Sequence, residues 1–131
     1  MKNHVSNTVF VLLVLFLAVS LHAQDKIATP EYWTAVGATA GMTYFDAATT
    51  LKVAGTRNCT EEGWTPWLYG KHPTTGRTVA AMSGEVVAGA VLSYEIKKHV
   101  RGKLGRMWAA PLGYLAGVHA RGAIHNLTVC G

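Results

Sequence analysis

Four polar side chains in otherwise apolar segments are the residues of this sequence whose types could do chemistry. Asp46, Glu85 and His119 each lie in a different apolar segment, and Asn126 follows His119 by seven residues. Two carboxylates and one imidazole can bind a divalent metal or relay protons. Seven residues make about two helical turns, so His119 and Asn126 share a helix face. Asp46, Glu85, His119 and Asn126 therefore form the candidate polar site.

The spacing of these residues does not select one chemistry. The sequence has no His-Glu-x-x-His, Gly-x-Ser-x-Gly or Cys-x-x-Cys pattern and no phosphate-binding loop. Three interpretations stay open: interhelical hydrogen bonds that fix packing, an intramembrane metal site, and a proton relay. Without a motif of supporting spacing we favour the first. It predicts a structural or accessory protein without catalysis or a cofactor.

Three segments must position these side chains, and they cover residues 33–53, 78–99 and 107–127. Each is rich in Ala, Val, Leu and Gly and is about as long as a bilayer crossing. Residues 54–77 contain Gly, Pro and Thr throughout, which predicts a loop, and residues 100–106 predict a tight basic turn. We expect one all-α domain over residues 24–131, a three-helix membrane bundle.

Small residues four apart recur in all three segments, for example Gly37 and Gly41 in the first and Gly113 and Gly117 in the third. In lipid, this spacing lets helix backbones approach each other closely. In water, each glycine inside a helix would cost about 1 kcal/mol relative to alanine. The glycines therefore favour a membrane bundle over the alternative, a soluble periplasmic helical binding domain.

The first segment carries a narrow polar stripe made of Thr39, Thr43, Asp46 and Thr50. At 100° per residue these side chains lie within roughly 60° of one another. Leaving Asp46 toward lipid would cost about 2.5–3.5 kcal/mol on insertion scales. The stripe is therefore expected to face the other two helices, where threonine hydroxyls, His119, Asn126 or a protonated Glu85 would contact Asp46.

The N-terminus predicts export. Lys2 precedes an apolar run at residues 9–19, and Ala23 ends a short stretch suited to cleavage, so residues 1–23 are expected to form a signal peptide. An uncleaved membrane anchor is the alternative. Outside the cytoplasm, Cys59 and Cys130 could form a disulfide, and two free thiols are the alternative. The expected location is the bacterial inner membrane, as a multi-pass protein, with the periplasm as the alternative.

Charge is concentrated in the basic turn, where Lys97, Lys98, Arg101, Lys103 and Arg106 fall within ten residues. Such clusters often bind nucleic acid, but no aromatic side chains are interleaved here for bases to stack on. We therefore expect membrane lipid, a second copy or another envelope protein as partners, and no nucleic acid. The positive-inside rule places this turn in the cytoplasm, whereas three crossings after a cleaved signal place it outside, so the orientation stays open.

Short motifs give a resemblance to a known group of proteins. They are the run at residues 46–50, Asp-Ala-Ala-Thr-Thr, the run at residues 59–62, Cys-Thr-Glu-Glu, followed by Pro66, and the run at residues 123–127, Ala-Ile-His-Asn-Leu. This pattern resembles a family of small three-helix bacterial membrane proteins of unknown function. Trp64-Thr65-Pro66 stands where that family would have Asn-Pro, and Glu85 stands where it would have a basic residue. The resemblance implies a fold and a location but no activity.

Overall fold

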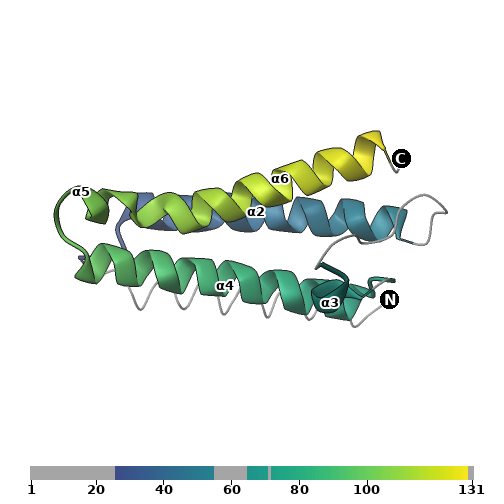
Figure 1. Ribbon diagram of the computed structural model, residues 1–131, viewed down its shortest axis with the longest axis horizontal. Coiled ribbons are helices and arrows are strands. Elements are labelled where there is room, and N and C mark those ends of the chain that lie inside the picture. The colour runs from purple at the N-terminus through teal and green to yellow at the C-terminus, as the bar shows by residue number, and fades with distance from the viewer. Residues whose placement is uncertain (1–25, 55–64, 71, 130–131) are drawn as a thin grey trace.

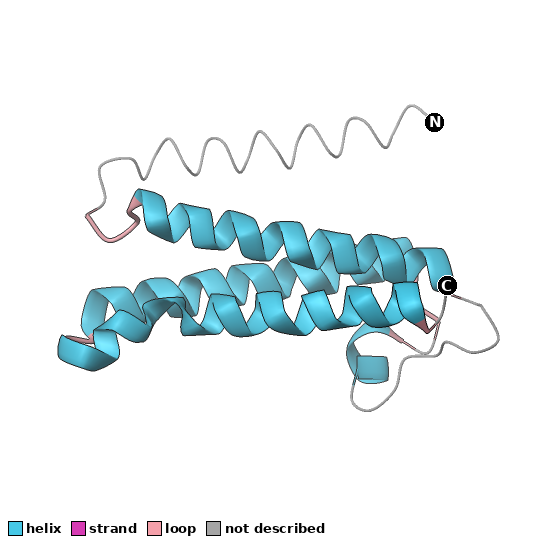
Figure 2. Cartoon of the chain, turned by 90° about the horizontal axis from the view of Figure 1, so that it is seen from above, coloured by secondary structure: helices cyan, strands magenta, loops and turns pink. Residues whose placement is uncertain are grey.

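The computed structural model describes residues 26–54, 65–70 and 72–129, and these residues are helical with short connections (Figure 1). Three long helices, α2, α4 and α6, run side by side in both views (Figures 1 and 2). The helices are α2 (Pro30–Val53), α3 (Thr65–Tyr69), α4 (Thr75–His99), α5 (Gly102–Gly105), the 3₁₀ helix η1 (Arg106–Ala109) and α6 (Ala110–Thr128). The predicted all-α class is confirmed.

The helix ends differ from the predicted ones for local reasons. Helix α2 begins three residues before the predicted start, because Pro30 suits the first helical position, where its missing N–H is not needed. Helix α4 also begins earlier, since the Thr74 hydroxyl accepts a hydrogen bond from the backbone N–H of Arg77 at 3.4 Å. The predicted third helix is divided, and its first residues belong to η1.

The long helices alternate in direction along the chain. Helices α2 and α6 are parallel, and α4 is antiparallel to both (Figure 1). One end therefore holds the start of α2 and the end of α4, where the Lys97 ammonium donates to the Thr29 hydroxyl at 2.5 Å. At the other end α3 is held against α4, because the Arg77 guanidinium donates to the carbonyl oxygens of Leu68 and Trp67 at 2.8 Å.

The interior of the bundle is unusually polar and its surface unusually apolar. The predicted inward orientation of the stripe is confirmed, since Thr39, Thr43, Asp46 and Thr50 are all buried. The other buried polar residues are Thr49, Thr78, Ser93 and His119. Large apolar side chains stand outside instead, among them Phe45, Val87, Val91, Leu92, Tyr114 and Val118. A water-soluble bundle normally has the opposite distribution.

The predicted use of small residues at the helix interfaces is wrong at most positions. A Cβ added at Gly37, Gly41, Gly84, Gly113 or Gly117 would meet no atom within 4 Å, so these glycines face away from the other helices. The close approaches occur at two other glycines. A Cβ at Gly89 would lie 2.5 Å from Leu115 Cδ1, and one at Gly122 would strike Asp46.

Two expectations lie outside the described residues: the signal peptide at residues 1–23 and the disulfide between Cys59 and Cys130. Within the described ranges, one helix, Thr75–His99, is long and apolar enough on average to cross a membrane. Helices α2 and α6 do not reach that average. Mean composition thus supports one spanning helix, not the predicted three.

Candidate functional site: a buried carboxylate–imidazole–carboxylate triad

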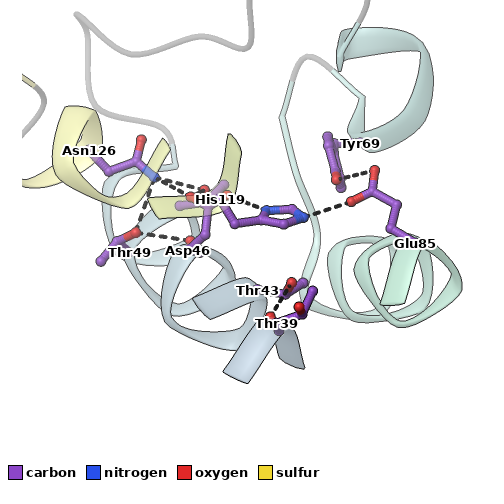
Figure 3. A network of polar contacts seen from close by, with 9 residues as sticks. Thr39, Thr43, Asp46, Thr49, Tyr69, Glu85, His119 and Asn126 are labelled. Carbon is purple, nitrogen blue, oxygen red and sulfur yellow. Dashed lines mark hydrogen bonds and ion pairs between the residues drawn. The ribbon is translucent and has the colours of Figure 1, made fainter. Parts of the chain in front are cut away.

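The side chains of Asp46, Glu85 and His119, one from each long helix, meet inside the bundle (Figure 3). His119 Nδ1 lies 2.8 Å from Asp46 Oδ2, and His119 Nε2 lies 2.9 Å from Glu85 Oε2. The His119 side chain is 4% exposed and that of Glu85 is 23% exposed. The imidazole is thus enclosed, while Glu85 retains some access to the surface.

Helix periodicity places two members of this triad on the buried faces of their helices. Asp46 belongs to the buried stripe of α2, and His119 lies on the face of α6 that is buried against it. Asp46 is seven residues from the last residue of α2, which corresponds to about 10 Å along the helix axis. The triad therefore lies nearer to the end of the bundle that carries α3 than to the basic end.

Asp46 is held by further donors from α2 and α6. The Asn126 amide donates to Asp46 Oδ1 at 3.3 Å, and the Thr50 hydroxyl donates to the same oxygen at 3.5 Å. The Asn126 amide nitrogen also lies 3.1 Å from Thr49 Oγ1 and 2.9 Å from Thr50 Oγ1. One amide has two hydrogens for three acceptors, so these contacts are shared. Asn126 thereby links the carboxylate to the end of α2.

Glu85 has its second partner in the segment that the sequence predicts as a loop. The Tyr69 hydroxyl donates to Glu85 Oε1 at 2.8 Å (Figure 3). Tyr69 is buried and belongs to α3, and it packs with Ala47 and Met82 in a small apolar cluster. Helix α3 therefore closes the network on the α4 side.

The contacts determine how many protons the triad holds. A neutral imidazole has one N–H, so it can donate through only one of its two nitrogens. Both nitrogens face carboxylate oxygens at hydrogen-bond distance, which requires a second proton in the triad. Two protons on these three groups leave a net charge of −1, and in an imidazolium between two carboxylates the donors Tyr69 and Asn126 both meet charged oxygens.

This arrangement differs from a metal site. Metal ligands converge on one point at about 2 Å, whereas here the two carboxylates lie on opposite sides of the imidazole and both ring nitrogens are engaged. Within the described part of the chain, no group of three His, Cys, Asp or Glu side chains could hold a metal ion. The predicted contact of Asp46 with a protonated Glu85 is replaced by an ion-pair bridge through His119.

The four predicted site residues are all in this network, and three further participants were missed. Tyr69 and Thr49 carried no signal, because Tyr69 lies in a loop-like segment and Thr49 is one position away from the stripe. Gly122 allows α6 to approach Asp46, since a Cβ there would lie 2.8 Å from Oδ1 and 2.9 Å from Oδ2. Its position three residues after His119 placed it on the same helix face, which was the available clue.

Comparisons with protein-family models, with curated proteins and with solved structures found no match for this chain. Its function is therefore inferred from the geometry of the triad and from the distribution of polar and apolar side chains.

Proposed function

We propose that this chain is a membrane-embedded helical bundle of the bacterial envelope with a structural or accessory role, and that the triad locks its three helices together. The observation that carries the proposal is the reversed polarity of the bundle. Charged and hydroxyl side chains share the interior with Tyr32, Met82, Leu112 and smaller apolar residues, and many large apolar side chains stand on the surface. That distribution is favourable in hydrocarbon, because apolar side chains can face hydrocarbon without a free-energy cost. Polar side chains cannot be hydrated there and need partners inside the bundle.

An apolar belt surrounds the middle of the bundle. Every exposed residue within 37–48 of α2, 79–92 of α4 and 110–118 of α6 is aliphatic, aromatic or glycine. At 1.5 Å per residue the belt spans about 20 Å along α4 and about 12 Å along α6, compared with about 30 Å for a bilayer core. Lys52, Lys98 and Arg121 are exposed beyond its edges, so these charges lie outside the belt. Snorkelling and local thinning accommodate such a mismatch at modest cost.

The low average hydropathy of α2 and α6 has a structural reason. An average over a helix counts every side chain, whereas lipid meets only the outer ones. In α2 the polar residues Thr39, Thr43 and Asp46 are buried against the other helices. In α6 His119 is buried, whereas Arg121 and His125 are exposed toward the end that carries α3. Intramembrane polar residues are expected to face inward and pair in this way.

The hydrogen bonds favour a packing role for the triad over proton transfer across the bundle. Toward the basic end, the Thr43 hydroxyl donates to the Thr39 carbonyl at 2.8 Å. The Thr39 hydroxyl in turn donates to the carbonyls of Ala35 and Leu112. Both hydroxyl protons are thus directed at backbone oxygens and away from the triad. A chain of proton carriers from the triad to the basic end is not formed by these groups, so the contacts serve packing.

Cell fractionation tests the location. We expect the full chain to stay in the membrane pellet after an alkaline carbonate wash and to be extracted by detergent. Release by osmotic shock without detergent would overturn the membrane placement and support the soluble periplasmic alternative. A periplasmic protein and an integral membrane protein of known location serve as controls in the same preparation.

A comparison of Asp46→Asn with a deletion strain tests the structural role. Asparagine keeps the shape of the side chain and its hydrogen bonds to the neighbouring hydroxyls but removes the negative charge. If the triad is a lock, any phenotype follows the amount of folded protein in the membrane, and raising expression of the variant restores it. A variant folded at the wild-type level that still behaves as the deletion would refute the structural role and favour proton chemistry at the triad.

A further inference from the structure

The end of the bundle opposite the triad is strongly basic. Its exposed or half-exposed basic residues are Lys26, Lys97, Lys98, Arg101, Lys103 and Arg106. Two carboxylates among the described residues lie at the same end. Glu95 is paired with His99 at 2.9 Å, and a hydrogen bond from Thr29 lowers the pKa of Glu31. Six basic groups against two acidic ones leave a marked positive excess.

The turn between α4 and α6 presents basic and apolar side chains together. Val100, Leu104 and Met107 are exposed, with exposed fractions of 37%, 67% and 57%. They alternate with Arg101, Lys103 and Arg106, which are also exposed. The combination of outward-facing basic and large apolar groups is typical of segments that lie in a membrane interface.

Two glycines hold the turn in this shape. Gly102 has a φ of +72°, a conformation that other residues rarely adopt. A Cβ at Gly105 would overlap the Val100 carbonyl oxygen, so only glycine allows the chain to fold back there. The basic and apolar side chains are therefore displayed by a defined backbone.

A layer of aromatic rings lies directly behind the turn. The Tyr32 ring contacts the rings of Trp33, Tyr94 and Trp108, with centroids 5.2, 6.1 and 6.0 Å apart. The Lys97 ammonium lies 4.7 Å from the centroid of Trp108. Tryptophan and tyrosine concentrate at the headgroup level of membrane proteins. The apolar belt, the aromatic layer and the basic turn thus follow one another along the bundle axis, as the layers of a bilayer do.

We propose that this basic turn is a binding surface for anionic phospholipid headgroups. Arg101, Lys103 and Arg106 contact lipid phosphates, while Leu104 and Met107 enter the boundary of the acyl chains. The proposal rests on the membrane placement inferred above and adds a lipid class and a site to it. Nucleic acid fits this surface less well, because a polyanion in water would leave the apolar side chains exposed and finds no interleaved aromatic rings.

A lipid titration of the detergent-purified full chain tests the proposal. Thermal unfolding is followed in micelles that contain increasing fractions of phosphatidylglycerol or phosphatidylcholine. We expect phosphatidylglycerol alone to raise the unfolding midpoint, since a ligand that binds the folded state stabilises it. The double variant R101Q/K103Q should need about 25-fold more phosphatidylglycerol, from about fivefold for each charge near an anionic surface.

The matched control is K52Q/R121Q, which also removes one exposed lysine and one exposed arginine, but at the opposite end. It should retain most of the preference for phosphatidylglycerol. An equal loss in both double variants, or equal stabilisation by both lipids, would overturn the headgroup site. Equal protection by a short oligonucleotide in place of the lipid would also overturn it, as that marks a general polyanion surface. These results concern the headgroup site alone, whereas osmotic-shock release refutes the membrane placement.

Discussion

Replacement of Gly122 by alanine tests the most specific feature of the triad, the close approach of α6 to Asp46. An alanine Cβ would lie 2.8 Å and 2.9 Å from the two carboxylate oxygens and 3.1 Å from Cγ. Ordinary contacts begin near 3.4 Å, so the carboxylate must retreat by about 0.5 Å. That movement stretches the 2.8 Å contact with His119, a charge-assisted hydrogen bond of a kind that contributes about 1.5–3 kcal/mol.

The expected size of the effect follows from two opposing contributions. Alanine is favoured over glycine inside a helix by up to about 1 kcal/mol. Loss of most of the Asp46–His119 hydrogen bond outweighs this gain, so Gly122→Ala should lower the free energy of unfolding by about 1–2 kcal/mol. Gly117→Ala is the matched control on the same helix, because a Cβ there meets nothing within 4 Å. It should leave stability unchanged or raise it by up to about 1 kcal/mol.

Thermal or denaturant unfolding in detergent micelles measures both variants. A double-mutant cycle then assigns the cause. In an Asp46→Ala background the carboxylate is absent, so Gly122→Ala should no longer destabilise the protein. If Gly122→Ala stabilises the wild-type chain as much as Gly117→Ala does, α6 and Asp46 are not in close contact, and the description of the triad is incorrect.

Three further predictions concern the network and the cysteines. His119→Ala leaves two carboxylates without their shared cation and should destabilise the bundle by about 3–5 kcal/mol in the same unfolding assay. His125→Ala, at an exposed position of the same helix, should change stability by less than about 0.5 kcal/mol, and comparable losses in the two variants would argue against a buried triad. Tyr69→Phe keeps the ring but removes the donor to the Glu85 carboxylate, so the free energy of unfolding should fall by about 1 kcal/mol. Unchanged stability of this variant would contradict the role of α3 in the network. Cys59 and Cys130 should form a disulfide, so a non-reducing mass measurement should give a value two hydrogens lower than after reduction, and two free thiols in the purified chain would exclude the bond.

The burial of Asp46 illustrates what could be predicted from the sequence. The i, i+4, i+7 and i+11 spacing of the stripe is a local property of one helix, so its shared direction followed without knowledge of the other helices. His119 and Asn126 were placed on one face of α6 by the same reasoning. The pairing of His119 with Asp46 and Glu85 could not be predicted from local spacing, because these two residues lie 73 and 34 positions away from His119 in the chain.

The glycines show the limit of such reasoning. Spacing four apart singled out Gly113 and Gly117, which face outward, and passed over Gly122, which lies against Asp46. Small residues can lie anywhere on a helix, and only the rotation of α6 about its axis decides which of them meets a neighbour. The same is true of Tyr69, whose hydroxyl reaches Glu85 because α3 folds back over α4.

The sequence by itself determined the helical class, the approximate extent of the three long helices and the inward direction of the polar stripe, because each depends on residues within a few turns of one another. The tertiary structure decided that the imidazole of His119 separates Asp46 from Glu85 and that the outer surface of the helices is an apolar belt. Both depend on the relative rotation and offset of helices that are distant in the chain, and local spacing contains no information about those two quantities.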